Sequence, residues 1–235
     1  MMISQKQLAV LAGLFAIGVG LFTVLARSQS QHDVAVLSFR VGQSFSEVVR
    51  DSSYPVLKHA GDPRQREDGF GWTDITVPVI LCFNDRQHGF ILPPTKFAAV
   101  TYQAGKVATV ATTPMLQKLP FEQAVAVLEN LQNQFKAGGW EPWKDDDSDW
   151  FDFTPEGKKR LYARMLEPQY VRSISLRVPK KYGMTFRLWC AKGCATRKPP
   201  YLFLIDVGVG SDTADWKAAE PMNWGTSTVR LSWSR

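Results

Sequence analysis

An uninterrupted apolar segment near the start of the chain limits the architectures that this sequence can adopt. The run LAVLAGLFAIGVGLFTVLA, residues 8–26, contains no charged side chain over nineteen positions. An α-helix of that length rises about 28 Å, which is close to the thickness of the hydrocarbon core of a bilayer. The sequence therefore predicts a transmembrane helix at the N-terminus, with a separate folded unit after it.

The charges beside this segment indicate the side of the membrane on which the rest of the chain lies. Lys6 precedes the apolar run and Arg27 follows it, and the free amino terminus adds a positive charge to the N-terminal side. This small bias favours a cytoplasmic N-terminus. We expect a single-pass protein of the bacterial inner membrane, with its bulk domain in the periplasm. The alternative is a cleaved secretory signal, because Val24, Leu25 and Ala26 supply short side chains at a suitable cleavage position.

Length and composition indicate a folded unit after the apolar segment. Hydrophobic residues make up 45% of the chain and aromatic residues 12%, so the remaining part can bury a sizeable core. We divide the chain into an anchor or signal segment (residues 1–27), a linker (28–35) and an α+β domain (36–235). The same length also permits two closely packed halves, residues 36–143 and 144–235.

The three cysteines are compatible with an oxidising compartment. Cys190 and Cys194 stand in WCAKGC, close enough to close a small loop, whereas Cys82 lies in the apolar stretch VPVILCF. We predict a disulfide between Cys190 and Cys194, because exported domains meet oxidising conditions. Zinc is disfavoured, since the C-x-x-x-C spacing has no neighbouring His or Cys to complete four ligands.

Helix signals occur at three places along the domain. Ser44 and Glu47 in SFSEVVR form a capping-box pattern, which predicts a short helix directly after Ser44. Residues 121–136 carry apolar side chains at steps of three and four, as in a helix with one face in a core. Thr154, followed by Pro155, predicts the start of a second main helix that runs to about residue 166.

Strand signals surround these helices. Gly105 separates two β-prone runs in FAAVTYQAGKVATVAT, which predicts a hairpin. The other β-prone runs are VAVLSFRV, WTDITVPVILCF, VRSISLRV, MTFRLWC, YLFLIDVGV and STVRLSWS. Strands in adjacent runs with helices between them predict an α+β fold, in which an antiparallel sheet packs with two main helices after an N-terminal transmembrane helix.

The stretch KDDDSDWFDFTPE, residues 144–156, is the most unusual polar segment. Its carboxylates copy the ligand spacing of a helix-loop-helix calcium site, but Trp150 stands where that loop needs glycine for its sharp turn. We therefore expect no metal site, and a solvated acidic loop near a helix N-terminus is one reading. The other reading is a surface that contacts a protein partner, with carboxylates for charge complementarity and indoles as anchors. Its candidate residues are Trp143, Asp145, Asp146, Asp147, Asp149 and Trp150.

Charge is segregated along the chain. Residues 141–156 carry seven acidic groups and one lysine, a balance of −6, whereas residues 157–200 carry twelve basic groups and one glutamate, a balance of +11. The two regions can neutralise one another through weak surface pairs. They can also leave a basic face for an anionic partner, which outside the cytoplasm means anionic lipid or an acidic protein surface, not nucleic acid.

Sequence patterns for catalysis are sparse. His32, His59 and His88 lie in a linker, a polar loop and a turn, and none is paired in sequence with a plausible ligand or nucleophile. The chain has no G-x-S-x-G, no H-E-x-x-H and no phosphate-binding glycine loop. We expect no catalytic residue, no cofactor and no enzyme. A hydrolase would need His59 or His88 to meet a nucleophile in space.

One part of the chain resembles a known class of proteins. The order of elements from residue 97 to residue 143 includes a hairpin strand, a leucine-proline entry, an amphipathic helix and a GGW exit, in GKVATVATTPMLQKLPFEQAVAVLENLQNQFKAGGWEPW. With the N-terminal export segment, this order resembles envelope-anchored immunity proteins of bacterial type VI secretion effectors. The resemblance rests on helix and turn patterns, so it transfers no functional residue.

Together these features predict a non-enzymatic protein that binds and neutralises a protein partner. The resemblance implies that this partner is a secreted toxin acting in the cell envelope. The alternative is a structural or scaffold subunit of an envelope assembly, which would use its basic residues to lie against anionic lipid.

Overall fold

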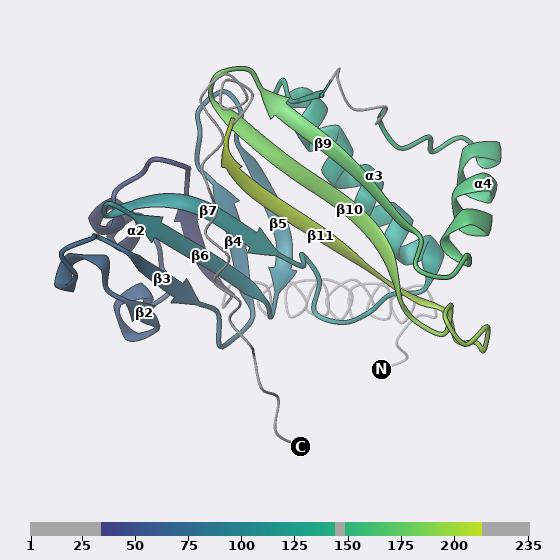
Figure 1. Ribbon diagram of the computed structural model, residues 1–235, viewed down its shortest axis with the longest axis horizontal. Helices are drawn as coiled ribbons and strands as arrows, with labels where there is room; N and C mark the ends of the chain where they lie inside the picture. Colours follow the sequence, from purple (N-terminus) through teal and green to yellow (C-terminus); the bar gives the residue numbers. More distant parts are fainter. Residues whose placement is uncertain (1–33, 144–148, 213–235) are drawn as a thin grey trace, which may run out of the picture.

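The computed structural model describes residues 34–143 and 149–212, and the bounds below refer to these ranges (Figure 1). The α-helices are α2 (Phe45–Asp51), α3 (Phe121–Ala137) and α4 (Pro155–Met165), with single 3-10 turns at Val56–Lys58 and Pro63–Gln65. The strands are β1 (Ala35–Phe39), β2 (Ala60–Gly61), β3 (Gly71–Asp74), β4 (Val79–Phe83), β5 (Phe90–Thr95), β6 (Ala98–Gln103), β7 (Lys106–Thr112), β8 (Glu141–Pro142), β9 (Val171–Val178), β10 (Tyr182–Lys192) and β11 (Leu202–Ser211). The prediction of an α+β domain with a large antiparallel sheet is confirmed.

The strands form two sheets in separate layers. The larger sheet has the order β2-β3-β6-β7-β11-β10-β9-β8, and its neighbouring strands are antiparallel. The smaller sheet has the order β1-β4-β5. In Figure 1 the smaller sheet and α3 lie behind the larger sheet. Aromatic side chains connect the layers, as where Phe83 meets Tyr182 at 5.0 Å and Phe135 meets Phe186 at 5.1 Å between ring centroids.

The large sheet contains strands from both of the halves that the sequence permits. Strand β7 lies before residue 143 and β11 lies after it, and the two pair between Val110 and Val209. The buried side chains of both segments also belong to one hydrophobic cluster. The two segments therefore share one sheet and one core.

The smaller sheet differs from the prediction. Strands β1 and β4 are parallel, with Leu37 opposite Leu81, whereas we expected a single antiparallel sheet. The run WTDITVPVILCF forms two strands, β3 in the larger sheet and β4 in the smaller one. The chain crosses between the sheets at residues 75–78, where Pro78 lacks the N–H that a continuous ladder needs.

Strand β5 has no counterpart among the predicted elements. Its sequence FILPPT contains Pro93 and Pro94, which argue against a strand in the middle of a sheet. Because β5 lies at the edge of the smaller sheet and pairs with β4 alone, proline can be tolerated there.

The helix signals correspond closely to the helices that form. Ser44 caps α2, and the Ser44 and Glu47 side chains make both hydrogen bonds of a capping box. Helix α3 ends at Ala137, with Gly138 as its C-cap, and the apolar stripe predicted along it is buried: Phe121, Ala124, Val125, Leu128, Leu131 and Phe135. The Thr154 hydroxyl accepts a hydrogen bond from the Gly157 amide, so α4 begins where Thr154 and Pro155 predict it.

A buried carboxylate also connects the two layers, beside the contact between Phe83 and Tyr182. Asp85, in the turn after β4, has a side chain that is 8% exposed. It accepts hydrogen bonds from Lys181 Nζ and the Tyr182 hydroxyl, both at 2.8 Å, and from the amides of Gln87 and His88, both at 2.9 Å. Burial alone would raise the pKa of Asp85, but these four donors outweigh burial and hold the pKa well below its ordinary value.

Several predicted segments fall outside the described ranges. They are the apolar run at residues 8–26, most of the linker, and the final β-prone run STVRLSWS. Among the helices within residues 34–143 and 149–212, none is long and apolar enough to cross a membrane.

Candidate functional site

The larger sheet has two unlike faces. Its inner face carries large apolar side chains, such as Phe186, Ile205 and Val207, which are buried against the second layer. On its outer face, defined here by the side chains that point the other way from β7, β9, β10 and β11, small residues lie side by side in one region. They include Thr109, Ala111, Ser175, Gly183, Thr185, Gly208 and Gly210.

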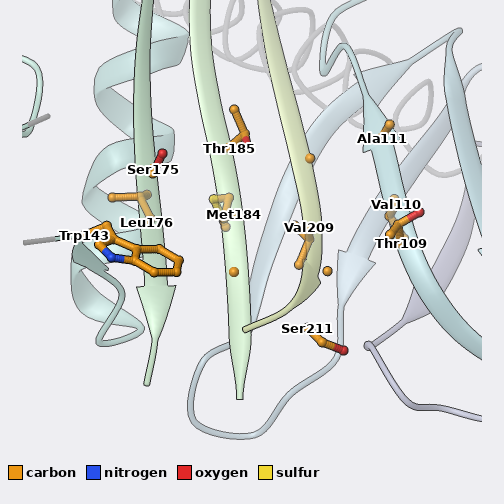
Figure 2. Close-up of a pocket in the computed structure, with 13 residues that line it drawn as sticks. Thr109, Val110, Ala111, Trp143, Ser175, Leu176, Met184, Thr185, Val209 and Ser211 are labelled. Carbon is orange, nitrogen blue, oxygen red and sulfur yellow. The ribbon is translucent and has the colours of Figure 1, made fainter. Parts of the chain in front are cut away.

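A hollow of about 360 Å³ lies on this outer face, and we call it the groove. Figure 2 shows it between Thr109–Ala111 on β7, Val209 and Ser211 on β11, Met184 and Thr185 on β10, and Leu176 on β9. The described residues that line it are uncharged. An open, uncharged hollow of this size suits a few uncharged side chains or a short backbone segment.

Glycines form the floor of the groove, and neither the backbone nor the surrounding packing requires glycine at Gly208 and Gly210. None of Gly183, Gly208 and Gly210 has a positive φ. A Cβ atom on Gly208 would meet only the Val110 carbonyl oxygen at 3.9 Å, and one on Gly210 would meet Thr109 Cγ2 at 3.5 Å, both ordinary contact distances. Glycine within a strand weakens it, and it often marks a place where another chain approaches closely.

Trp143 stands at the border of the groove. Its backbone N–H donates to the Ser175 carbonyl at 2.9 Å, and in Figure 2 its indole lies across β9 beside Leu176. The Arg177 guanidinium lies 5.4 Å from the indole centroid, and Arg177 Nε faces a Glu141 carboxylate oxygen at 3.5 Å. A large aromatic side chain therefore borders a floor of small residues.

The other predicted contact residues divide into two groups. Asp145, Asp146 and Asp147 lie outside the described residues. Asp149 is exposed and accepts a hydrogen bond from the Trp150 amide at 2.6 Å, while the Trp150 ring lies 5.0 Å from Lys136 Nζ. Trp150 and Trp143 thus have different surroundings, and of the two indoles Trp143 is the one that lines the groove.

The basic residues after position 156 are partly neutralised. Arg160 pairs with Asp152 of the acidic stretch at 2.7 Å. Arg177 pairs with Glu141, which also belongs to residues 141–156, while Lys158 pairs with Glu129, Arg164 with Glu167 and Lys181 with Asp85. Residues 141–156 therefore account for two of these five pairs within the described part of the chain.

Two of the three histidines are described, and both contact groups of the surrounding fold. His88 is buried, and its Nδ1 lies 2.7 Å from the Gly138 carbonyl oxygen. The His59 ring lies 5.4 Å from the Tyr54 ring, and its Nδ1 is 3.4 Å from the Thr76 hydroxyl. Neither residue lines the groove.

The cysteines and acidic side chains are the remaining candidates for a disulfide, a reactive thiol or a metal site. Cys190 and Cys194 form a disulfide, with their Cα atoms 6.2 Å apart. Burial raises the pKa of the Cys82 thiol, which lies half-buried on β4. Within residues 34–143 and 149–212, no group of three or more His, Cys, Asp or Glu side chains is placed to hold a metal ion.

Sequence reasoning missed the groove, although one signal for it was present. The run DVGVGS places Gly208 and Gly210 two residues apart on β11, so both lie on the same face of a strand. Alternation of glycine with valine is unusual for a strand whose outer face is merely solvated, because glycine costs strand stability.

Comparison with known proteins adds no further assignment at this site. The chain matches no protein-family model, no curated protein and no solved structure.

Proposed function

We propose that this protein acts by binding, without catalysis, and holds a protein partner in the groove on the outer face of its large sheet. The observation that carries the proposal is the floor formed by Gly208 and Gly210, where neither the backbone nor the packing requires glycine. Bare backbone in the middle of an open face allows a segment of another chain to approach closely.

The chemistry of the border favours a protein as the partner. Trp143 offers a large amphipathic surface of the kind that dominates protein interfaces. The hydroxyls of Thr185 and Ser211 on the lining provide neutral donors and acceptors. An uncharged, partly apolar segment of a partner can pack against the indole with its apolar groups and bond the hydroxyls with its polar groups.

The acidic residues that follow Trp143 in the sequence favour a positively charged partner. Trp143 borders the groove, and four acidic residues follow it within six positions of the sequence: Asp145, Asp146, Asp147 and Asp149. Such a cluster accelerates the approach of a positively charged surface. The proposed partner is a secreted toxin with a basic surface around its contact segment, met in the periplasm by a domain anchored through residues 8–26.

Filling the floor of the groove tests this proposal. We expect Gly208→Phe to leave the thermal midpoint within a few degrees of wild type, because a Cβ at this position meets no crowding. Binding should weaken at least about tenfold, a loss of about 1.4 kcal/mol or more. Ala99→Phe is the matched control, since Ala99 lies on the same face of β6 but outside the groove.

The partner is identified with the same variants. Tagged full-length wild type, Gly208→Phe and Ala99→Phe are crosslinked in envelope and secreted fractions of the source, and retained proteins are identified by mass spectrometry. A secreted enzyme held by wild type and Ala99→Phe, and lost with Gly208→Phe, supports the proposal if the purified chain also inhibits that enzyme. Equal retention by all three chains contradicts the groove assignment. Retention of resident membrane proteins instead favours the scaffold alternative.

A further inference from the structure

A second hollow, of about 280 Å³, lies between α4 and the start of β9, away from the lining of the groove. Three arginines line it: Arg160 and Arg164 from α4, and Arg172 from β9. The rings of Trp150 and Tyr170 lie on its border. We call it the arginine pocket. In Figure 1, α4 stands at the side of the domain beyond β9.

Each guanidinium in the arginine pocket is oriented by a neighbouring group. Arg164 Nε lies 3.2 Å from Glu167 Oε1, and its guanidinium stacks 4.7 Å from the Tyr170 ring centroid. Arg172 donates to the Asp149 carbonyl at 2.8 Å and lies 5.7 Å from the Phe151 ring centroid. Orientation by neighbours reduces the entropy that an arginine loses when it binds a ligand.

These contacts leave most of the donors unused. A guanidinium carries five N–H groups. Within the described chain, Arg160 uses one nitrogen for Asp152 at 2.7 Å, Arg172 uses one for the Asp149 carbonyl, and Arg164 uses one for Glu167. The remaining donors are available to a ligand that enters the arginine pocket.

The charge balance of the arginine pocket is positive. The carboxylates that face its arginines are Asp152 on the lining and Glu167 beside Arg164. Asp152 is already engaged, because it also accepts hydrogen bonds from the Thr154 amide at 3.0 Å and the Thr154 hydroxyl at 2.7 Å. Among the described residues, three positive groups against these two carboxylates leave one net positive charge, and the two ion pairs are exposed and therefore weak.

We propose that the arginine pocket binds a phosphate group. Three guanidinium forks from two elements present more donors than the two oxygens of a carboxylate can accept. A phosphate presents three or four oxygens, and arginine binds phosphate in a bidentate manner. The source of the phosphate is either a soluble phosphate compound or the head group of an anionic lipid, which the domain would meet beside a membrane.

This site is independent of the proposed function. Its lining shares no residue with the groove, and its ligand is an anion, whereas the groove is lined by uncharged residues. Loss of phosphate binding would leave the groove proposal untouched, and failure of the groove proposal would not affect the arginine pocket.

The test uses the full-length chain in a non-ionic detergent. Inorganic phosphate is titrated at constant ionic strength, with heat of binding and thermal midpoint as readouts. We expect saturable binding by wild type and at least about tenfold weaker binding by Arg160→Gln and by Arg172→Gln, as is typical when a hydrogen bond to a charged group is lost. Arg160 is an exposed helical residue, so its variant should fold even if Arg172→Gln is destabilised.

Lys159→Gln is the matched control. It removes the same charge from the neighbouring position of α4, but Lys159 does not line the arginine pocket. We expect its affinity for phosphate to stay within about twofold of wild type, because exposed charges act weakly at a distance. No saturation by wild type, or an equal loss with Lys159→Gln, overturns the proposal.

A second titration identifies the source of the phosphate. The detergent is mixed with phosphatidylglycerol or with phosphatidylcholine, and inorganic phosphate is titrated again. Competition by phosphatidylglycerol but not by phosphatidylcholine, seen both in wild type and in Lys159→Gln, assigns the arginine pocket to anionic lipid head groups. Phosphate binding without such competition assigns it to a soluble phosphate compound.

Discussion

Replacing Asp85 with Asn should lower the free energy of unfolding by about 2–4 kcal/mol at pH 7. The variant removes the charge that four donors surround, and an amide nitrogen takes the place of one accepting oxygen. Tyr182 begins β10 and Lys181 directly precedes it, so the substitution also weakens the connection between the two layers. Chemical denaturation followed by far-UV circular dichroism measures the change.

The same carboxylate makes stability depend on pH in a defined direction. Because the pKa of Asp85 is lowered on folding, its contribution is complete above the ordinary carboxyl pKa of about 3.9 and is lost as the pH falls below that value. Wild type should therefore lose stability between about pH 5 and pH 2 more steeply than Asp85→Asn.

Asp68→Asn is the control for this prediction. Asp68 also pairs with a basic side chain, Arg66, but its own side chain is 59% exposed. The exposed pair should contribute less than about 1 kcal/mol. A similar loss in both variants would mean that burial of Asp85 has no special effect on stability.

Replacing Phe83 with Ala should lower the free energy of unfolding by about 3–5 kcal/mol. Phe83 is 1% exposed, and its ring meets Phe90 and Tyr182 at 5.0 Å, Phe39 at 5.7 Å and Trp140 at 6.0 Å. The substitution leaves a cavity where the smaller sheet packs against β10. This loss is a large fraction of the stability of an ordinary domain.

Phe97→Ala provides the comparison for the core variant. Phe97 is 60% exposed, so its removal should change stability by no more than about 0.5 kcal/mol. Hydrogen exchange should locate the effect of Phe83→Ala in β1, β4 and β5, which form the smaller sheet. A loss below about 1 kcal/mol, or uniform exchange across both sheets, would contradict the role given to Phe83.

The helices could be predicted from the sequence because their signals are local. Each signal relates residues that are at most four positions apart in the sequence. The signals are the capping box of Ser44 and Glu47, the steps of three and four along α3, and the Thr154-Pro155 start of α4. Division of the strands between two sheets could not be predicted in the same way. Which sheet receives β3 or β4 depends on distant partners, as when Leu81 pairs with Leu37.

The sites depend on distant contacts to an even greater degree. Asp85 bonds Lys181 and Tyr182, which are more than ninety positions away in the sequence, and no local pattern predicts that contact. The arginine pocket needs α4 and β9 side by side, although its basic residues were visible as a charge excess. The groove could be predicted in part. The alternating glycines of β11 are visible in the sequence, whereas the pairing of β11 with β7 and β10 is not.

The short strands at the two edges of the large sheet affect how copies of this domain behave together. A long unpaired edge would act as a template for another chain and promote aggregation. Here the outermost strands, β2 and β8, have two residues each, and Pro142 in β8 has no N–H to donate. Addition of another copy's strand at β2 or β8 is therefore disfavoured.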